Sequence, residues 1–474
     1  MTMISSPSSP VSDAQDGCQP GYVWMISIVA AMGGLLFGWD WVVIGGAKPF
    51  FESYFHIQDN VRASAWANSC ALIGCLVGAL MAGRLSDRYG RKKLLLASAL
   101  WFAATSIGNA LAPVFSLFIA WRILGGVAIG LASNLSPMYI AEVAPASKRG
   151  RLVSINQMTI VIGVLAAQLV NWHLVRDLPA GASNDFIRNS WYGQFGWRWM
   201  FAVTALPSVL FFLGMLVVPE SPRWLARMGK AVQAGDILRR IGGQEYAART
   251  MNDITTLLSS ESDKADFKEL FQPRPLKVLV LGVGLAVFQQ WCGINVIFNY
   301  AEEIFKAAGY DISNVLKNIA FTGSVNMVFT FVALGAVDRF GRRPLMLFGS
   351  AALAAIYTVL AFCYHSHVQG LPMLLLVLAA ISAYAMSLAP VTWVVISEIF
   401  PNRMRGAAMS LAVSALWLAC FFLTFTFPML NASLGASGTF FLYAAICLAG
   451  FFFIQFRLPE TKNKSLEQIQ RDAY

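Results

Sequence analysis

Two oppositely charged side chains lie inside long apolar runs and are the first candidates for chemistry. Asp40 ends the string GGLLFGWD, and Arg122 lies within the apolar residues 115–138. An ionisable side chain in a segment that crosses a membrane is costly to insert, so it is a functional candidate by default. Because two lone opposite charges in one helical bundle neutralise each other best by pairing, we predict that Asp40 and Arg122 pair in at least one conformation. The arginine would keep Asp40 ionised, and loosening the pair would let the carboxylate take a proton.

A second interpretation of Asp40 stays open at this point. Lys48 follows eight residues later. If both residues lie near the outer end of their helix, water solvates the carboxylate and no functional role is needed.

Three uncharged amides form the second candidate site. Gln289, Gln290 and Asn295 lie in an otherwise apolar run, and Gly293 weakens the helix between them. Amides offer both donors and acceptors, which suits the hydroxyl groups of a neutral solute. The alternative is that these side chains merely join helices, as amides do in membranes.

The composition indicates which elements must position these residues. The chain is 57% hydrophobic and 13% charged, whereas soluble domains are about 25% charged, so we predict a polytopic membrane protein. The formal net charge is +10. The basic residues lie in short loops between apolar runs, where they set topology and face anionic lipid. We therefore expect a lipid bilayer and no nucleic acid as partner.

The seven scattered cysteines are not a disulfide framework.

Twelve apolar segments are long enough to cross the hydrocarbon core, which takes about 20 residues. They lie near residues 22–44, 63–83, 94–112, 115–138, 153–174, 198–218, 277–299, 315–336, 344–364, 371–396, 407–430 and 438–457. Basic loops alternate with uncharged ones between these segments, which places both termini in the cytoplasm. The predicted domains are a disordered tail (1–20), a six-helix bundle (21–218), a cytoplasmic linker of short amphipathic helices (219–276), a second six-helix bundle (277–458) and a cytoplasmic tail (459–474).

Internal repeats indicate that the two bundles arose by duplication. The string DRYGRKK (87–93) recurs as DRFGRR (338–343), 251 positions later. Four residues that begin with Glu142 recur at an offset of 256, and Pro219-Glu220 recurs as Pro459-Glu460. Parallel halves that rock about a site at the bilayer midplane are the geometry of one large class of transporters.

These motifs closely resemble the sugar porter family of the major facilitator superfamily, over residues 33–468. The motifs that carry the resemblance are GGLLFGWD (33–40), DRYGRKK, RILGGVAIG (122–130), PMYIAEVAPASKRG (137–150), PESPRWL (219–225), QQWCGIN (289–295), DRFGRR, SEIFPNRMRG (397–406) and PETKNKSLE (459–467). The acid in the first span makes the chain look most like the bacterial proton-coupled, xylose-type symporters. The resemblance implies an all-α membrane protein with the major facilitator fold, twelve helices in two six-helix pseudo-repeats.

The resemblance also assigns roles to single residues. It implies that Asp40 is the acid that binds the coupling proton, and that Thr204 stands where some relatives have a second acid. The implied sugar-binding residues are Gln157, Gln289, Gln290, Asn295, Asn326 and Trp393, with aromatic walls at Phe37 and Trp417, and we add Asn299. Asn299 stands where relatives often have a tyrosine, Leu416 where an amide is common, and Ala389 where a glycine usually bends the helix.

Charged motifs at the predicted cytoplasmic ends form a third set. We predict a gate network of salt bridges across helix ends, which forms when the pore opens outward and breaks on inward opening. Its members are Arg91, Glu142, Arg149, Glu220, Arg223, Arg342, Glu398 and Arg405. Exposed ion pairs are each worth about 0–1 kcal/mol, so the network acts through its sum. The alternative, that these residues are topology signals, explains the arginines but not the matched glutamates.

Together these features predict a transporter rather than an enzyme. We expect symport of a monosaccharide, a pentose or hexose, with a proton by alternating access, in a monomer that crosses the cell inner membrane. The proton is the coupling ion, and neither a cofactor nor a metal is expected, since His365 and His367 lack further ligands near Cys363. A proton-independent sugar facilitator and a non-transporting sugar sensor are the alternatives.

Overall fold

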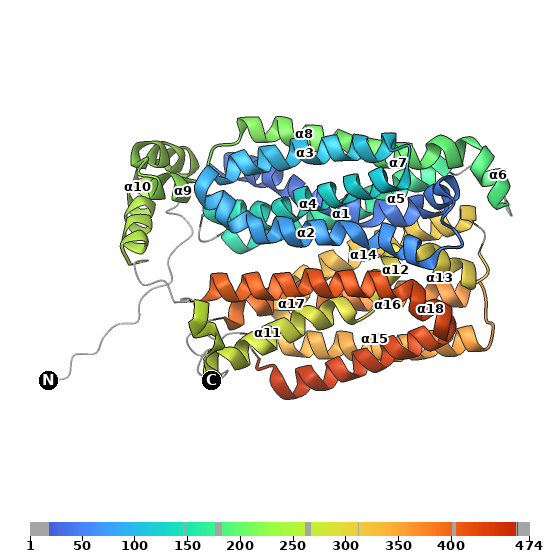
Figure 1. Cartoon of the computed structure of the whole chain (residues 1–474). Helices are drawn as coiled ribbons and strands as arrows, with labels where there is room; N and C mark the ends of the chain where they lie inside the picture. The colour runs from blue at the N-terminus through green and yellow to red at the C-terminus, as the bar shows by residue number, and fades with distance from the viewer. Residues whose placement is uncertain are drawn as a thin grey trace.

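The chain folds into two helical bundles that lie side by side along their lengths (Figure 1). The computed structural model describes residues 19–145, 148–175, 183–260, 267–310, 312–400, 404–460 and 462. The first half of the chain, blue to green in Figure 1, forms one bundle, and the second half, yellow to red, forms the other. All regular elements of the described residues are helices.

The first bundle begins with five long helices and ends with a segmented one. The helices are α1 (Pro20–Phe55), α2 (Val61–Tyr89), α3 (Arg91–Leu111), α4 (Phe115–Val143), α5 (Arg149–Val175), the short α6 (Asn184–Asn189), the π-helix η3 (Tyr192–Gly196), α7 (Trp197–Val203) and α8 (Ala205–Val217). The last three together make one span, Tyr192–Val217.

The linker and the second bundle follow. They comprise α9 (Pro222–Arg227), α10 (Ala231–Ser260), the 3₁₀-helix η4 (Phe267–Phe271), α11 (Pro273–Trp291), α12 (Ile294–Asn299), α13 (Ala301–Ala307), α14 (Ile312–Phe340), α15 (Arg342–His365), α16 (Leu371–Met386), α17 (Leu388–Ile399) and α18 (Arg405–Arg457).

These helices provide the twelve predicted crossings. Eleven helices of the described residues are long and apolar enough to span a membrane. One of them, α18, has 53 residues and turns at Gly435, whose φ of 68° and ψ of 173° are not helical, so it crosses twice. Exposed apolar side chains such as Leu100, Val217 and Phe456 cover the outer surfaces, as contact with hydrocarbon requires. The prediction of an all-helical membrane protein with twelve spans is confirmed.

Small residues let the helices of the first bundle approach closely. A Cβ atom on Gly126 of α4 would collide with the backbone carbonyl of Ala71 on α2, and one on Gly130 would collide with that of Cys75. The RILGGVAIG motif therefore packs α4 against α2, in the way that small residues serve helix contacts in membranes.

Two spans of the second bundle are broken at the level of the candidate site. Gly293 has a φ of 88°, in the left-handed region that glycine tolerates, and it separates α11 from α12. The tenth span breaks at Ser387, three residues before Pro390, whose ring removes a backbone donor. The tenth span therefore breaks near Ala389 although a glycine is missing at that position.

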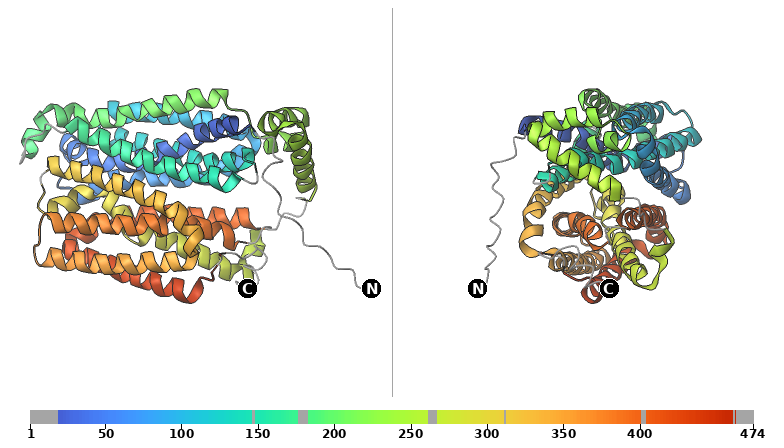
Figure 2. Two further views of the ribbon diagram at one scale, coloured as in Figure 1. Left: turned by 180° about the vertical axis from the view of Figure 1, so that it is seen from behind. Right: turned by 90° about the vertical axis from the view of Figure 1, so that its left-hand side faces the viewer.

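The linker helices lie at one end of the bundles, visible at the left of Figure 1 and again in Figure 2. Both described ends of the chain lie there too, because the amide of Gln19 bonds the carbonyl of Ile241 in α10 at 2.8 Å, and Lys462 reaches the carbonyl of Arg339. Trp224 of α9 bonds the carbonyl of Asp87 at 2.9 Å, which attaches the linker to the first bundle. We call this end the linker end, and the opposite one the far end.

Candidate functional site

Asp40 and Arg122 form a buried ion pair between α1 and α4. The guanidinium Nη1 donates to Asp40 Oδ1 at 2.8 Å, and the two residues are 7% and 3% exposed. The predicted pairing is confirmed. Burial also contradicts the alternative that water solvates Asp40 at the end of its helix.

The surroundings of the pair are apolar or neutral. The guanidinium of Arg122 lies 5.6 Å from the ring centre of Phe201, a distance at which an aromatic face attracts a cation. Thr204, where a second acid would stand, gives its hydroxyl to the carbonyl of Met200 at 3.4 Å. The charge of Arg122 is therefore directed to Asp40.

The three amides of the seventh span form a hydrogen-bonded chain, which we call the amide cluster (Gln289, Gln290 and Asn295). Gln290 Nε2 donates to Gln289 Oε1 at 2.6 Å, and Asn295 donates to Gln290 Oε1. The break at Gly293 makes this possible, because it turns Asn295 back toward the end of α11. Each amide is at most 6% exposed, so the cluster is a preorganised set of buried donors and acceptors.

Tyr384 of α16 extends the cluster and was missed by the sequence analysis. Gln289 Nε2 donates to its hydroxyl at 2.6 Å. A tyrosine 95 positions away from Gln289 carries no local pattern that connects it with the amides. Only the packing of α16 against the broken span reveals the contact.

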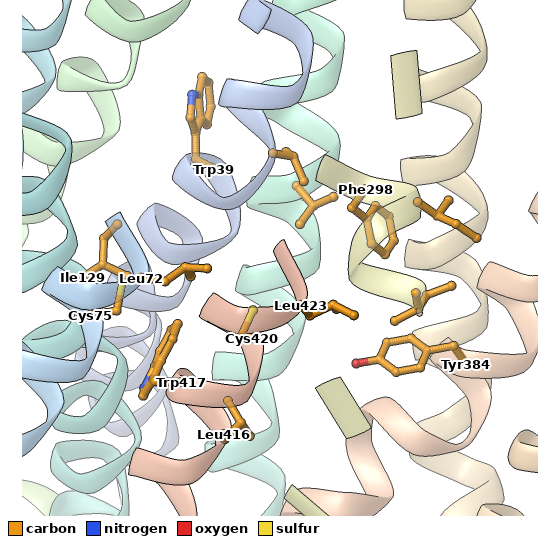
Figure 3. Close-up of a cluster of buried hydrophobic side chains, with 14 of the residues drawn as sticks. Trp39, Leu72, Cys75, Ile129, Phe298, Tyr384, Leu416, Trp417, Cys420 and Leu423 are labelled. Carbon is orange, nitrogen blue, oxygen red and sulfur yellow. The ribbon is translucent and has the colours of Figure 1, made fainter. Parts of the chain in front are cut away.

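Aromatic rings join the two bundles beside these polar groups. Phe37 of α1 lies 5.7 Å from Trp417 of α18 and 5.7 Å from Trp41, measured between ring centres. Figure 3 shows α18 residues Leu416–Leu423 between Leu72 and Cys75 on one side and Tyr384 and Phe298 on the other. The predicted wall residues Phe37 and Trp417 therefore meet, and Trp41 completes a group of three rings.

The remaining predicted binding residues are more dispersed. Asn299 of α12 is 5% exposed and lines a small cavity with Asp40. Asn326 of α14 is buried, Gln157 of α5 is half-buried and Trp393 of α17 is 37% exposed. Within the described residues, none of these last three bonds to the amide cluster through its side chain. Their assignment to a solute site stays a prediction.

At the linker end of the first bundle, Glu142 and Glu220 hold the start of α3. Arg91 bonds Glu142 Oε2 at 3.1 Å, and Glu220 Oε1 accepts from the backbone amides of Arg91 at 3.0 Å and Lys92 at 3.1 Å. A carboxylate at a helix N-terminus is favoured by the free amides and the helix dipole. Gly90, with a φ of 96°, allows the approach, because a Cβ there would collide with that carboxylate.

The second bundle repeats this arrangement. Arg342 bonds Glu398 Oε1 at 3.1 Å, and Glu460 accepts from the amides of Arg342 and Arg343, both at 3.1 Å. Gly341, with a φ of 94°, takes the place of Gly90. The duplicated motifs are therefore duplicated helix caps, and among the described residues the carboxylates of Glu220 and Glu460 each bond within their own bundle.

Three further members of the predicted gate network remain. Arg149 and Arg223 are exposed, and the side chain of Arg405 lies outside the described residues. Ser221, by contrast, was missed, and its hydroxyl donates to Glu142.

A buried charged group at the far end was also missed. Lys48 of α1 is 6% exposed and forms an ion pair with Glu303 of α13 in the other bundle, which we call the far-end ion pair. The ammonium lies 3.6 Å from Glu52 and 5.5 Å from the ring centre of Tyr300. A cavity of about 360 Å³ lies beside it, lined also by Ser64 and other polar residues. Lys48 was interpreted only as a sign of a solvated helix end, because its partner lies 255 positions away.

Comparison with known proteins relates this geometry to a family. Residues 26–473 match the family model described as "Sugar (and other) transporter". The chain is 38% identical over 480 residues to the D-xylose-proton symporter of Escherichia coli (strain K12), with 95% of each chain covered. It is 39% identical over 452 residues to the arabinose-proton symporter of Bacillus subtilis (strain 168), again with 95% of each covered.

A solved structure has the same architecture. The chain superposes on a partially occluded inward-open conformation of the xylose transporter XylE from E. coli with a TM-score of 0.83 and 35% identity, over 94% of this chain and 100% of that one.

The Asp40–Arg122 pair generates a stability prediction. We expect Arg122→Met to destabilise the protein at pH 8 by about 3 kcal/mol, because removing one partner leaves a buried charge uncompensated. The loss should largely disappear in the double variant Asp40→Asn with Arg122→Met, which leaves no charge at this place. Thermal unfolding in detergent measures this. Equal losses for the single and double variants would contradict the pairing energetics.

Proposed function

The chain belongs to the sugar (and other) transporter family, and on that premise we propose that it imports a monosaccharide, a pentose or hexose, by proton symport through alternating access. The observation that carries this proposal is the buried Asp40–Arg122 pair. A facilitator needs no titrating acid in its interior, whereas a symporter needs a group whose charge changes once in each cycle.

The amide cluster supports a neutral polyol as the solute. Its buried donors and acceptors match hydroxyl groups, and none of its three side chains carries a charge that would select an ionic substrate. The rings of Phe37, Trp41 and Trp417 supply apolar faces against which a sugar ring can lie. D-xylose and arabinose, the solutes in the names of the two similar symporters, are the first to test.

The proton supplies the energy for accumulation. One elementary charge crossing about 100 mV releases about 2.3 kcal/mol, and about 1.4 kcal/mol corresponds to a tenfold concentration ratio. One proton per sugar therefore supports roughly forty-fold accumulation from the membrane potential alone. In this scheme protonation of Asp40 weakens its bond to Arg122, and the carrier moves inward with both proton and sugar bound. It returns empty, with Asp40 ionised and paired with Arg122.

The linker end is assigned to the cytoplasm and the far end to the outer face of the inner membrane. The basic loops that contain Arg88 and Arg343 lie at the linker end, and such loops stay cytoplasmic. The chain then functions as a monomer, because one polypeptide supplies both bundles of the site. Protons and the sugar are its only ligands in this scheme, and no cofactor takes part.

The far-end ion pair acts as the outer gate in the present conformation. Lys48 and Glu303 come from different bundles, so the bundles cannot separate at the far end while this bond holds. The similarity to an inward-open structure supports the same assignment, in which the outer end is closed. Opening to the outside requires the pair to break.

Two other functions would leave different traces. A proton-independent facilitator would equilibrate sugar without accumulation, and a sugar sensor would bind without flux. Uptake into proteoliposomes with and without an imposed pH gradient distinguishes the three.

Asp40→Asn tests the coupling. We expect this variant to keep sugar counterflow within about threefold of the native rate but to lose accumulation, because an amide cannot exchange a proton. Counterflow and gradient-driven uptake of D-xylose are measured in the same proteoliposomes, with the exposed acid Asp59 replaced by Asn as a matched control. Retained accumulation in Asp40→Asn would refute proton coupling through this residue.

Gln290→Ala tests the solute site. Gln290 sits in the middle of the amide cluster, so its loss removes two hydrogen bonds of the preorganised set, each worth about 1 kcal/mol, in addition to any bonds to sugar. We expect affinity for sugar to fall at least tenfold in a protein that still folds, with a melting temperature lowered by the loss of these two bonds. Tyr384→Phe, which removes only the outermost bond of the chain, should give a smaller loss. Unchanged affinity in both variants would show that the amide cluster is not the sugar site.

Lys48→Met tests the outer gate. We expect it to raise the rate at which an impermeant maleimide labels Ser64→Cys in the far-end cavity, by about tenfold if the pair contributes about 1.4 kcal/mol to closure. The charge swap Lys48→Glu with Glu303→Lys should restore slow labelling. Lys306→Met is the control, because Lys306 pairs with Glu302 within its own helix. If Lys306→Met also raises the labelling rate, or if Lys48→Met leaves it unchanged, the far-end ion pair is not the outer gate.

A further inference from the structure

A small polar cavity lies against the Asp40–Arg122 pair and is not explained by sugar binding. Its volume is about 20 Å³, and its polar lining is Asp40, Asn68, Arg122 and Asn299. Leu72, Cys75 and Ile129, shown in Figure 3, form much of its apolar wall. The three ionic and polar groups of the first bundle thus share one space with a single amide of the second.

Asn68 of α2 lines this space, and a hydrogen bond holds its side chain. It is 4% exposed, and its Nδ2 donates to the carbonyl of Ser64, one turn earlier, at 2.9 Å. Its Oδ1 is buried and has no hydrogen-bond partner among the described residues. Leaving a buried acceptor unsatisfied costs about 1–3 kcal/mol, so a partner for this oxygen is expected.

Arg122 presents the complementary group. Its Nη1 is used by Asp40, but its Nε is buried and has no acceptor within the part of the chain that the structure describes. Two residues that line the cavity of about 20 Å³ therefore carry one unpaired acceptor and one unpaired donor. A buried water needs about 10–15 Å³ and two to four polar partners, so the space suits one water molecule.

We propose that Asn68 is a positioning residue for proton exchange at Asp40, because its side-chain oxygen fixes a water that delivers the proton to the carboxylate. This inference rests on the proposed proton symport and assigns the route by which the proton reaches Asp40. Asn299 closes the cavity from the second bundle, so the water is enclosed only while the bundles are together at this level.

The proton step balances without any further reactant. The water accepts a proton from the solvent side and gives one of its own protons to an oxygen of Asp40, so it is regenerated. Asp40 changes from carboxylate to carboxylic acid, and the ionic bond to Arg122 becomes a weaker bond to a neutral group. Asn68 is neither protonated nor deprotonated, since it acts only as an acceptor.

Asn68→Leu keeps the size of the side chain but removes the acceptor, and it is the test variant. We expect the ratio of gradient-driven D-xylose uptake to counterflow to fall about tenfold, which is the loss expected for one hydrogen bond in a charged network. Because proton delivery becomes limiting, its uptake should keep rising as the pH falls through the range where native uptake has levelled off. Asn68→Ser retains an acceptor oxygen and should behave like the native protein.

Asn109→Leu is the matched control. Asn109 of α3 is also buried, with an unpartnered Oδ1, but it does not line the cavity at Asp40. It should change stability without changing the ratio or the pH profile. If Asn68→Leu keeps the native ratio, or lowers uptake and counterflow in parallel as the control does, the positioning role is wrong. Failure of proton symport itself is separate, because it appears as accumulation that survives Asp40→Asn.

Discussion

The architecture depends on keeping two opposite charges together where there is almost no water. Asp40 and Arg122 are 7% and 3% exposed and lie on different helices, so neither is stable there without the other. Their contact holds α1 against α4. The glycines that pack α4 against α2 also bring Asn68 next to the ion pair. A structural requirement for neutrality and a functional requirement for a titrating group are therefore met by the same pair.

The features that depend on local pattern were predictable from the sequence. The length of the apolar segments predicted the membrane spans, and the matched DRYGR and DRFGR strings predicted the duplication. The ionic pairing of Asp40 with Arg122 followed because two lone charges in one bundle have few alternatives. Gly293 was identified as a weak point of its helix for a physical reason, the freedom of its φ angle, and the helix breaks there.

The features that were missed depend on how helices rotate and meet. Tyr384 reaches Gln289 only because α16 packs beside the broken span, and Lys48 finds Glu303 only because the two bundles touch at the far end. Asn68 resembles any other polar residue of an apolar helix until the cavity at Asp40 is known. In each case the partners are separated by tens to hundreds of positions, and no periodicity links them.

The paired helix caps at the linker end carry a mechanical consequence. Glu220 and Glu460 each tie the last span of a bundle to the sharp corner between its second and third spans, and in the described part of the chain neither carboxylate bonds to the other bundle. Opening the inner mouth can therefore leave both corners intact. Each bundle can therefore rotate as a rigid body. The contacts that break and form during the cycle are then those at the interface between the two bundles.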